Sequence, residues 1–302
     1  MTSQQIASIV DAHVHFWNLG RLSYPWLAAD APPRPFGDHG PIKRSYQPDD
    51  YRIDLHGLTL EACVHIQANC ADPRGETLWL EECAQRTGLP TALIAFVDLR
   101  HPRAEEELEW LAARPPGLAR GVRQLLNWHD EPLRRATDRF DLMDDAAFRS
   151  GFARLERHGF VFDLGCLPAQ LQMACRLADD FPGVTMALNH LGWPILSDSD
   201  GVARWRSGMR DLARRPNVAL KVSGLWPIER RWAPERLRPF VRDAIDWFGF
   251  DRCMYGSNFP IEKLMTPVPD QVTTLLAILD DVSGEELAKF FKITAQRVYR
   301  LP

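Results

Sequence analysis

Two histidines, His13 and His15, stand two residues apart in a short apolar segment near the start of the chain, Asp11-Ala-His13-Val-His15-Phe-Trp17. If this segment is a β-strand, its side chains alternate between two faces, and the two imidazoles share one face about 7 Å apart. Neutral imidazoles at that spacing can meet at one metal ion or one substrate. Alone, the pair is a weak signal, because buried structural histidines produce it as well.

Polar side chains also stand near the ends of seven further apolar segments. In chain order they are His65 and Gln67; Asp98 and Arg100; Arg123, Gln124 and Asn127; Asp163; Asn189 and His190; Lys221 and Ser223; Ser257 and Asn258. Apolar layers otherwise fill the interior of a parallel barrel, so polar groups at the carboxyl end of every strand indicate a site. For any one of these residues, and for Asp11, a structural hydrogen bond or ion pair is an equally good explanation.

These segments are the predicted strands of the fold. They are residues 9–15, 61–68, 91–98, 119–125, 159–164, 184–190, 218–223 and 253–257. Most are apolar on both faces, as the strands of a parallel sheet covered by helices are. Helical patterns alternate with them, and eight βα units over about 250 residues favour a TIM barrel over a doubly wound sheet. The predicted fold class is therefore α/β, with a single (β/α)8 barrel domain over residues 1–302.

One long, proline-rich segment, residues 18–50, separates the first predicted strand from the second. It carries six prolines together with Trp26 and three other aromatic residues. As the loop after the first strand it would lie over the mouth of the barrel, where the active sites of this fold lie. A packing arm or a contact within a homo-oligomer explains the segment equally well.

Composition argues against several classes of partner and setting. The net charge of -4 gives no sign of the clustered Lys and Arg that nucleic-acid binding needs. No segment approaches the roughly 18 apolar residues of a membrane helix, and the N-terminal residues do not resemble a signal peptide. The six cysteines form no C-x-x-C pair, which argues against a cysteine-type zinc site and for a reduced, cytoplasmic setting. We expect a small-molecule partner, and no nucleic acid or membrane.

Six segments, taken in order, resemble one family. They are Asp11-Ala-His13-Val-His15-Phe-Trp17, Phe96-Val-Asp98-Leu-Arg100, Gly121-Val-Arg123-Gln124, Leu188-Asn-His190, Lys221-Val-Ser223-Gly and Tyr255-Gly-Ser257-Asn258-Phe-Pro260. Together they resemble the amidohydrolase-related (amidohydrolase 2) lactonase branch of the amidohydrolase superfamily, a group similar to 2-pyrone-4,6-dicarboxylate lactonase and to L-fucono- and L-rhamnono-lactonases. The resemblance covers roughly residues 9–300 and implies a TIM barrel that hydrolyses a cyclic ester.

The resemblance also implies a reactive centre made of His13, His15 and His190, which would be the ligands where a divalent metal such as zinc is bound. The family's usual residue after strand eight is an aspartate that completes the metal site and takes a proton from the attacking water. This chain has Asn258 there, and an amide has no useful basicity. Glu262 is the nearest carboxylate. Because the branch includes members that work without metal, we expect metal-independent activity here and keep Asn258 among the catalytic candidates.

In this interpretation each residue type has a task in opening a lactone. His13 and His15 polarise the carbonyl or stabilise its oxyanion, and neutral His190 is the expected base. Arg123 suits a substrate carboxylate because its fork binds two oxygens, unless it forms an ion pair with Asp98 or Asp163. The remaining predicted substrate contacts, which supply a charge, amide or imidazole groups, or an apolar wall, are Lys221, Gln124, Asn127, His65, Trp17 and Trp26.

Three other functions stay open from the sequence. A metal-dependent decarboxylase of the same superfamily would use the same strand ends, usually with an acid after strand eight. An amidase would need a fuller set of metal ligands. A barrel that lost its base and only binds a ligand is the alternative outside enzymes, although the joint presence of His13, His15, Arg123 and His190 argues against it.

Overall fold

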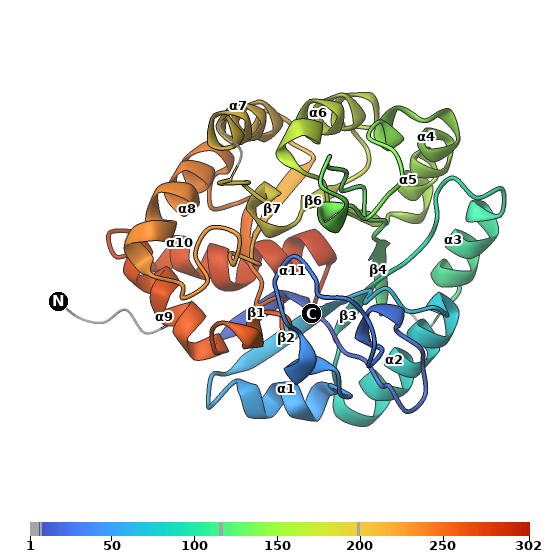
Figure 1. Ribbon diagram of the computed structural model, residues 1–302, viewed down its shortest axis with the longest axis horizontal. Coiled ribbons are helices and arrows are strands. Elements are labelled where there is room, and N and C mark those ends of the chain that lie inside the picture. Colours follow the sequence, from blue (N-terminus) through green and yellow to red (C-terminus); the bar gives the residue numbers. More distant parts are fainter. Residues whose placement is uncertain (1–5, 7, 115–116, 198–199) are drawn as a thin grey trace.

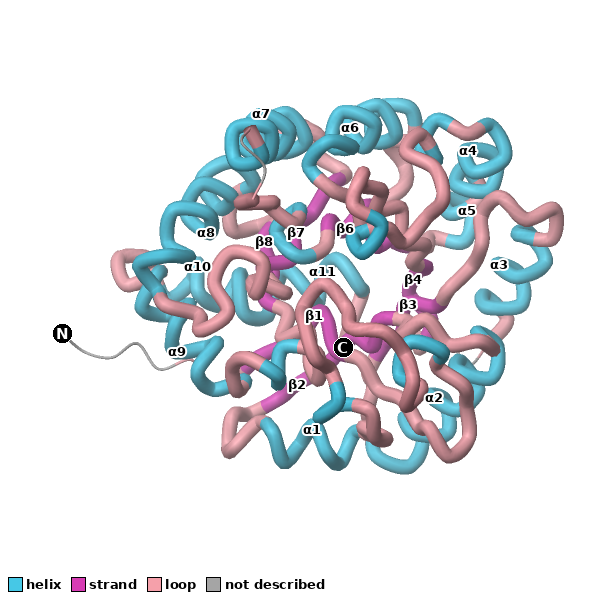
Figure 2. Tube along the Cα trace, in the orientation of Figure 1, coloured by secondary structure: helices cyan, strands magenta, loops and turns pink. Residues whose placement is uncertain are grey.

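The computed structural model describes residues 6, 8–114, 117–197 and 200–302 as a parallel sheet surrounded by helices (Figure 1). The strands are β1 (Ile9–Val14), β2 (Leu60–Ile66), β3 (Ala92–Ala95), β4 (Ala119–Val122), β5 (Val161–Leu164), β6 (Met186–Leu188), β7 (Val218–Val222) and β8 (Cys253–Tyr255). Each strand pairs in parallel with the next along the chain, from β1 to β8. The predicted (β/α)8 barrel is confirmed, and Figure 2 shows the strands inside a ring of helices.

Backbone contacts just beyond β8 bring the last strand back to the first. The Asn258 N–H donates to the carbonyl of His13 at 2.7 Å, and the His15 N–H donates to the carbonyl of Phe259 at 2.7 Å. These two bonds hold the end of β8 against the segment that carries both histidines of the H-x-H pair.

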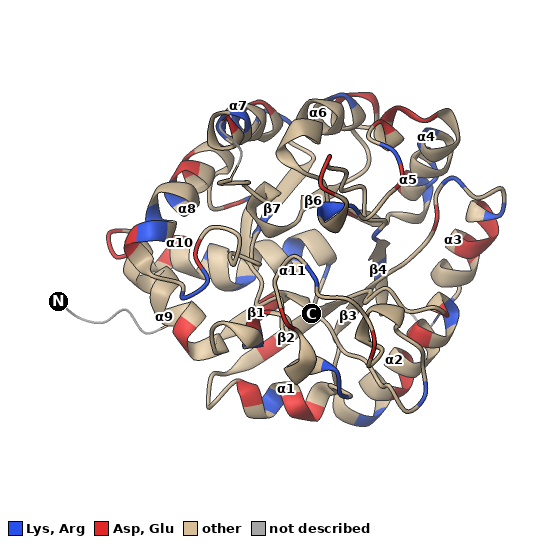
Figure 3. Cartoon of the chain, in the orientation of Figure 1, with Lys and Arg blue, Asp and Glu red and all other residues tan. Residues whose placement is uncertain are grey.

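Helices follow the strands and cover the outside of the sheet. They are α1 (Pro48–Asp54), α2 (Pro73–Thr87), α3 (Ala104–Ala112), α4 (Ala146–Ala153), α5 (Leu155–His158), α6 (Leu171–Asp180), α7 (Gly201–Ala213), α8 (Pro234–Phe248), α9 (Val268–Ile278), α10 (Gly284–Ala288) and α11 (Thr294–Tyr299), with a π-helical turn (Lys289–Ile293) between the last two. Charged residues of both signs lie on these outer helices (Figure 3). Among the described residues, no helix is long and apolar enough to cross a membrane. All six cysteines are free thiols.

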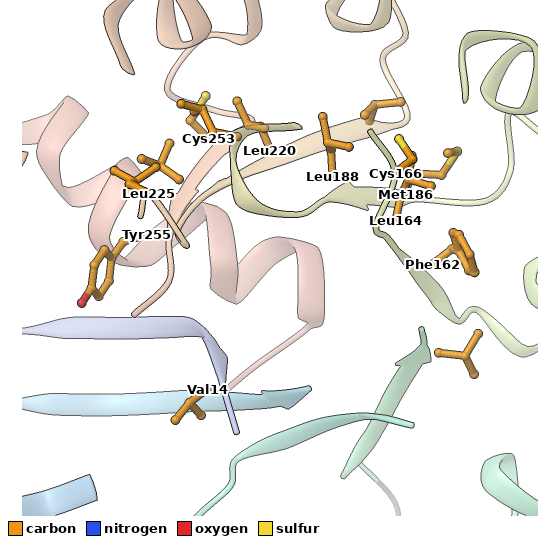
Figure 4. Close-up of a cluster of buried hydrophobic side chains, with 14 of the residues drawn as sticks. Val14, Phe162, Leu164, Cys166, Met186, Leu188, Leu220, Leu225, Cys253 and Tyr255 are labelled. Carbon is orange, nitrogen blue, oxygen red and sulfur yellow. The ribbon is translucent and has the colours of Figure 1, made fainter. Parts of the chain in front are cut away.

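Two apolar layers lie on opposite sides of the strands. The outer layer, between strands and helices, is large and includes Phe162, Leu188, Leu220 and Tyr255 (Figure 4). The inner layer is much smaller, and many of its residues are alanines: Ala12, Ala62, Ala92, Ala187 and Ala219. A barrel interior is usually filled by Val, Ile and Leu, so these alanines leave space that other side chains must fill.

Asp11 is a structural residue of β1. The pairing of β1 with β2 shifts register between Asp11 and Val14, as a β-bulge does. The Asp11 carboxylate accepts hydrogen bonds from the backbone N–H groups of His13 and Ser257, each at 2.9 Å, and from the Tyr51 hydroxyl of α1. It thus ties β1 to the end of β8, which is one of the two roles that the sequence left open.

The segment of residues 18–50 folds over the mouth of the barrel. It contains two short 3-10 helices, Pro25–Leu27 and Gly40–Ile42, and an antiparallel bridge between Trp17 and Tyr46. Helix α1 already begins at Pro48, so the irregular segment is slightly shorter than predicted. Because Trp26, Arg34 and Phe36 of this segment line the cavity described next, the position over the mouth is confirmed.

Candidate active site

A cavity opens at the carboxyl ends of the strands. Its lining includes His15, Trp26, Arg34, Phe36, Arg123, Asn127, Arg134, Arg135, His190, Trp193, Trp226 and Asn258. Four of these residues are arginines, and no Asp or Glu occurs among the described residues that line the cavity. The walls are largely aromatic and apolar. The cavity therefore suits a ligand with an apolar body and a negative charge.

The three predicted catalytic histidines meet at the floor of this cavity. Nε2 of His13 lies 3.2 Å from Nε2 of His15, and the rings of His13 and His190 have centroids 4.4 Å apart. The predicted shared face of His13 and His15 is confirmed. Nδ1 of His15 lies 2.7 Å from the Ile66 carbonyl, and Nδ1 of His190 lies 3.0 Å from the Ser223 hydroxyl. His15 and His190 line the cavity, while His13 lies one layer deeper.

A left-handed turn after β6 aims His190 into the cavity. Four successive residues have positive φ: His190 (54°), Leu191 (55°), Gly192 (66°) and Trp193 (45°). Each non-glycine residue in this conformation costs about 1–2 kcal/mol, a strain that proteins keep mainly at functional sites. The Trp193 ring stacks on the imidazole of His190 at a centroid distance of 4.9 Å. A Cβ at Gly224 would lie 2.4 Å from Nδ1 of His190, so the close approach of the segment after β7 requires glycine there.

The histidines at the site are uncharged at neutral pH. Burial lowers the pKa of His13, His15, His65 and His190, and the nearby Arg123 lowers each of them further. For His15 the pKa falls to about 3. Neutral imidazoles are acceptors and bases, so the site has the protonation state that base catalysis needs.

Arg123 projects from the end of β4 as a buried cation. Burial lowers its pKa to about 10, which leaves the guanidinium charged at neutral pH. One of its nitrogens donates to the Gln67 carbonyl, and its Nε has no partner among the described residues. Neither Asp98 nor Asp163 forms an ion pair with it in the described parts of the chain. The structural ion pair that the sequence left open is therefore not found.

Asn258 occupies the position after β8 with a left-handed backbone, φ 55°. Its side chain lines the cavity beside His15. Its Oδ1 is buried and has no partner within the described structure. The amide of Asn127, which also lines the cavity, is buried without partners in the same sense. Buried polar atoms without partners are costly, about 1–3 kcal/mol each, so these groups are available to a ligand or to water in the cavity.

Lys221 lies under the cavity rather than in its wall. Its ammonium pairs with the Asp163 carboxylate, and both side chains are fully buried. Burial lowers the pKa of Lys221 to about 8, while Asp163 acts in the opposite direction, so the ammonium form predominates at neutral pH. Lys221 is not placed to touch a substrate.

Three further predicted substrate contacts lie outside the cavity. His65 faces away from the interior because its neighbours Val64 and Ile66 belong to the inner layer, and its Nδ1 accepts the Phe16 N–H. Gln124, the neighbour of Arg123, bonds the Leu99 N–H at 3.0 Å and Asp98 at 2.8 Å. Trp17 packs edge-on behind Trp26 at 5.4 Å. None of these three, nor Lys221, lines the cavity, although Gln124 lines a hollow beside it that shares Trp26 and Arg34 with it.

Glu262, the carboxylate that we considered from the sequence, is a structural residue. It is fully buried outside the cavity lining, and it accepts hydrogen bonds from Nε1 of Trp232 at 3.2 Å and from the Trp226 N–H at 3.3 Å. Burial raises its pKa to about 7. Its role is to hold the segment that places Trp226 in the cavity wall.

Sequence reasoning missed most of the cavity wall. Arg34, Phe36, Trp193 and Trp226 stand in loops after β1, β6 and β7, where no strand periodicity marks them. The available signal was the clustering of aromatic and basic residues beside prolines, as in Arg34-Pro-Phe36 and Trp193-Pro.

The predicted metal ligands do not make a complete set of donors. Within residues 6, 8–114, 117–197 and 200–302, no group of three or more His, Cys, Asp and Glu side chains is arranged to hold a metal ion. His13 and His15 bring two nitrogens together, but Asn258 adds no negative charge, and Arg123 and Lys221 add positive charge nearby.

Comparisons with known proteins cover almost the whole chain. A family model described as Amidohydrolase matches residues 10–301. The chain is 33% identical over 303 residues to the uncharacterized protein y4mH of Sinorhizobium fredii, covering 97% of this chain and 99% of that protein. It is 31% identical over 306 residues to an L-fucono-1,5-lactonase of Burkholderia multivorans, covering 97% and 96%. A crystal structure of an amidohydrolase from Burkholderia multivorans with bound zinc has a TM-score of 0.82 at 28% identity, over 98% of this chain and 100% of that one.

Proposed function

This chain belongs to the amidohydrolase family, and we propose that it is a hydrolase that opens a lactone ring carrying an anionic group. The observation that supports this most is that a base and two cations face the same cavity. A neutral imidazole with a spare nitrogen, that of His190, faces the same space as two guanidiniums without carboxylate partners, those of Arg34 and Arg123.

The arginines argue for the anionic group. Nε of Arg34 is buried without a partner, and burial lowers the pKa of this guanidinium just as it does for Arg123. Arg134, by contrast, already pairs with Glu131 at 2.6 Å. Asp163 and Glu76 raise the pKa of Arg123 against the larger effect of burial, but neither forms an ion pair with it among the described residues. A neutral sugar lactone would offer Arg34 and Arg123 no charged partner, whereas a carboxylate on the substrate can accept two hydrogen bonds from one guanidinium. The aromatic walls then hold the apolar part of the ring.

His190 is the general base in this proposal. Nδ1 of His190 lies 3.0 Å from the Ser223 hydroxyl. In this proposal Nδ1 carries the proton and donates it to that hydroxyl oxygen, and Nε2 keeps the lone pair. That nitrogen takes a proton from a water molecule, whose other hydrogen the Oδ1 of Asn258 can accept.

Ring opening then proceeds through a tetrahedral intermediate. The water oxygen bonds to the lactone carbonyl carbon, and the amide of Asn127 donates to the developing oxyanion. The ring C–O bond breaks, and protonated His190 returns its proton to the leaving oxygen. The products are a hydroxyl and a carboxylate, so one proton is released per ring at neutral pH. His13 and His15, predicted to polarise the carbonyl, instead support His190 from below.

We propose that this reaction needs no resident metal ion. A structural relative carries zinc, but the donor set here consists of neutral imidazoles, an amide in place of a carboxylate, and two neighbouring cations. A divalent ion gains much of its affinity from anionic ligands, and zinc sites usually supply at least three protein donors. No step above passes through a metal.

A panel of lactones tests the proposal. Purified enzyme should release one proton per ring opened from carboxylated lactones, measured by titration at constant pH, with little turnover of neutral sugar lactones. Arg123→Lys should raise KM about tenfold or more for the carboxylated substrate, because a point charge replaces a bidentate fork. A decarboxylase would instead consume a proton and release CO2. Proton release from no member of the panel, or CO2 release from carboxylated compounds, would contradict the proposal.

A further inference from the structure

A chain of buried polar groups runs down the barrel interior below the cavity. Nζ of Lys221 lies 3.5 Å from Nδ1 of His13 and forms an ion pair with one oxygen of Asp163. The other Asp163 oxygen accepts the hydroxyl of Tyr299 at 2.7 Å. We call Tyr299, Asp163, Lys221, His13 and His15 the axial column. None of these five residues is more than 3% exposed, so the Lys221–Asp163 ion pair is fully buried.

Lys221 and the Ile66 carbonyl, which contact the two imidazoles from either side, determine where the ring protons of His13 and His15 lie. An ammonium only donates, so Nδ1 of His13 must accept from Lys221, and the ring proton of His13 must be on Nε2. That proton points to Nε2 of His15 at 3.2 Å. Nε2 of His15 must then accept, which leaves its proton on Nδ1, where the Ile66 carbonyl at 2.7 Å accepts it. Lys221 at one end and a carbonyl at the other thus allow one arrangement.

This arrangement decides what the histidine pair can do. Two nitrogens bound to one zinc ion at about 2.0–2.1 Å would lie about 3.4 Å apart, so the observed 3.2 Å alone fits a metal pair or a hydrogen bond. A nitrogen that carries a proton has no lone pair for a metal. Since Lys221 places the His13 proton on Nε2, the pair is a hydrogen bond.

We propose that Lys221 is a positioning residue that replaces the metal ion of this site: its fixed ammonium sets the tautomer of His13 and so converts the His13–His15 pair from metal ligands into a hydrogen-bonded support for His190. The inference rests on the metal-free site proposed above, but not on the identity of the substrate.

The fold is built to hold this ammonium. Tyr299 enters from the last helix, α11, which crosses the centre of the barrel in Figure 1, and its ring lies 5.0 Å from Nζ of Lys221. The alanines of the inner layer leave the space that Tyr299, Asp163 and Lys221 fill. Burying an ion pair costs desolvation energy, so such a pair contributes little to stability and more often specifies one arrangement.

The experiment reads tautomers and zinc affinity directly. Protein labelled with 15N in its nine histidines is studied by NMR, with His13 and His15 assigned from single His→Gln variants. The test variant is Lys221→Met with Asp163→Leu, which removes both buried charges together. The matched control is Lys263→Met with Asp54→Leu, a Lys–Asp pair at 2.6 Å outside the cavity. Zinc affinity is measured by equilibrium dialysis in all three proteins.

In the unmodified protein His13 should carry its proton on Nε2 and His15 on Nδ1, and zinc should bind the pair weakly. The test variant should show His13 with its proton on Nδ1 in part of the population. It should also bind zinc about tenfold more tightly, a gain that an added His13→Gln abolishes, while the control stays at the original values. A His13 proton on Nδ1 in the unmodified protein would overturn the inference, even if the test variant does not fold. Equal zinc affinity in a folded test variant would also overturn it. Neither readout involves a lactone, so failure here is distinct from failure of the lactonase proposal.

Discussion

The molecule contains two trios of Lys, Asp and Tyr with nearly the same internal contacts. In the axial column, Lys221 pairs with Asp163, which accepts the Tyr299 hydroxyl at 2.7 Å. In what we call the outer trio, Lys263 pairs with Asp54 at 2.6 Å, and Asp54 accepts the Tyr46 hydroxyl at 2.7 Å. Each ammonium also lies over the ring of its own tyrosine, at 5.0 Å and 5.7 Å.

The trios differ in burial and in what they touch. The side chains of Lys221 and Asp163 are 0% exposed, whereas Lys263 is 37% exposed and Asp54 11%. Lys221 also reaches an imidazole, and Lys263 joins α1 to the segment after β8. The outer trio therefore holds the segment after β8 against α1, whereas the trio of the axial column determines which nitrogen of His13 carries the proton. The neighbour, rather than the trio itself, decides the role.

The largest difference should appear when each lysine is removed alone. Lys221→Met leaves Asp163 buried and unpaired, which typically costs 3–5 kcal/mol of stability. Lys263→Met leaves Asp54 with the Tyr46 hydroxyl and some access to water, because Lys263 itself is 37% exposed, so the loss of stability should be smaller. Urea unfolding of both variants measures the difference. Equal losses would show that the two trios are equivalent.

The second difference is catalytic and concerns His13 of the axial column, which packs on His190. His190→Ala removes the proposed base and should lower kcat by about 100-fold or more. His13→Ala should also lower kcat about 100-fold, because His190 loses its support. The exposed His101 is the control, and His101→Ala should keep full activity. Steady-state kinetics on a lactone opened by the enzyme check this, and full activity in both site variants would remove the site assignment.

Acid should lower the stability of the protein by protonating the buried imidazoles in and beside the axial column. Four buried imidazoles have lowered pKa values, so their contribution to stability is complete above pH 6.5 and is lost as the pH falls below it. Glu76 and Glu262, with pKa values raised to about 7 from 4.5, act in the opposite direction between those values. Because the four imidazoles outnumber these two carboxyl groups, the free energy of unfolding should fall as the pH is lowered from 6.5.

The slope of unfolding free energy against pH measures this effect in the unmodified protein and in the two double variants. Burial and His190 lower the pKa of His13 most, but Lys221 lowers it as well. Removing Lys221 and Asp163 should therefore make the slope shallower, while removing Lys263 and Asp54 should leave it unchanged. A rise in stability toward pH 5 would contradict the assignment of neutral buried imidazoles.

The smallest difference concerns the tyrosine hydroxyls. Tyr299→Phe and Tyr46→Phe each remove one hydrogen bond to a carboxylate, so both should cost about 1.5–3 kcal/mol of stability. Only Tyr299→Phe should change kcat, by a few-fold, because Asp163 then holds Lys221 less firmly under His13. A similar loss of kcat in Tyr46→Phe would mean that the effect is general loosening of the fold.

The fold was predictable because it repeats. All eight strands lie within or beside the predicted segments, since apolar runs alternate with amphipathic helices throughout. The predicted ends were too long, as at residues 91–98 against Ala92–Ala95, because polar residues after a strand turn into the loops. His13, His15, Arg123, Asn127, His190 and Asn258 could be placed at one mouth because parallel strands end together.

Other features had no local signal. Asp163 and Lys221 are 58 residues apart in the chain, and Asp163 and Tyr299 are 136 apart. The sequence around each residue therefore does not indicate that the three side chains are in contact. The prediction that His65 faces the barrel interior was wrong for a different reason. Polar strand ends indicate a site only if they face inward, and the inward face of β2 is set by Val64 and Ile66.

The most direct test is proton release by the metal-depleted enzyme. Protein dialysed exhaustively against a chelator, with its metal content determined, is titrated at constant pH with a carboxylated lactone. We expect one proton per ring opened at an undiminished rate, with far less than one equivalent of metal in the protein. Activity that chelation abolishes and one equivalent of zinc restores would contradict it.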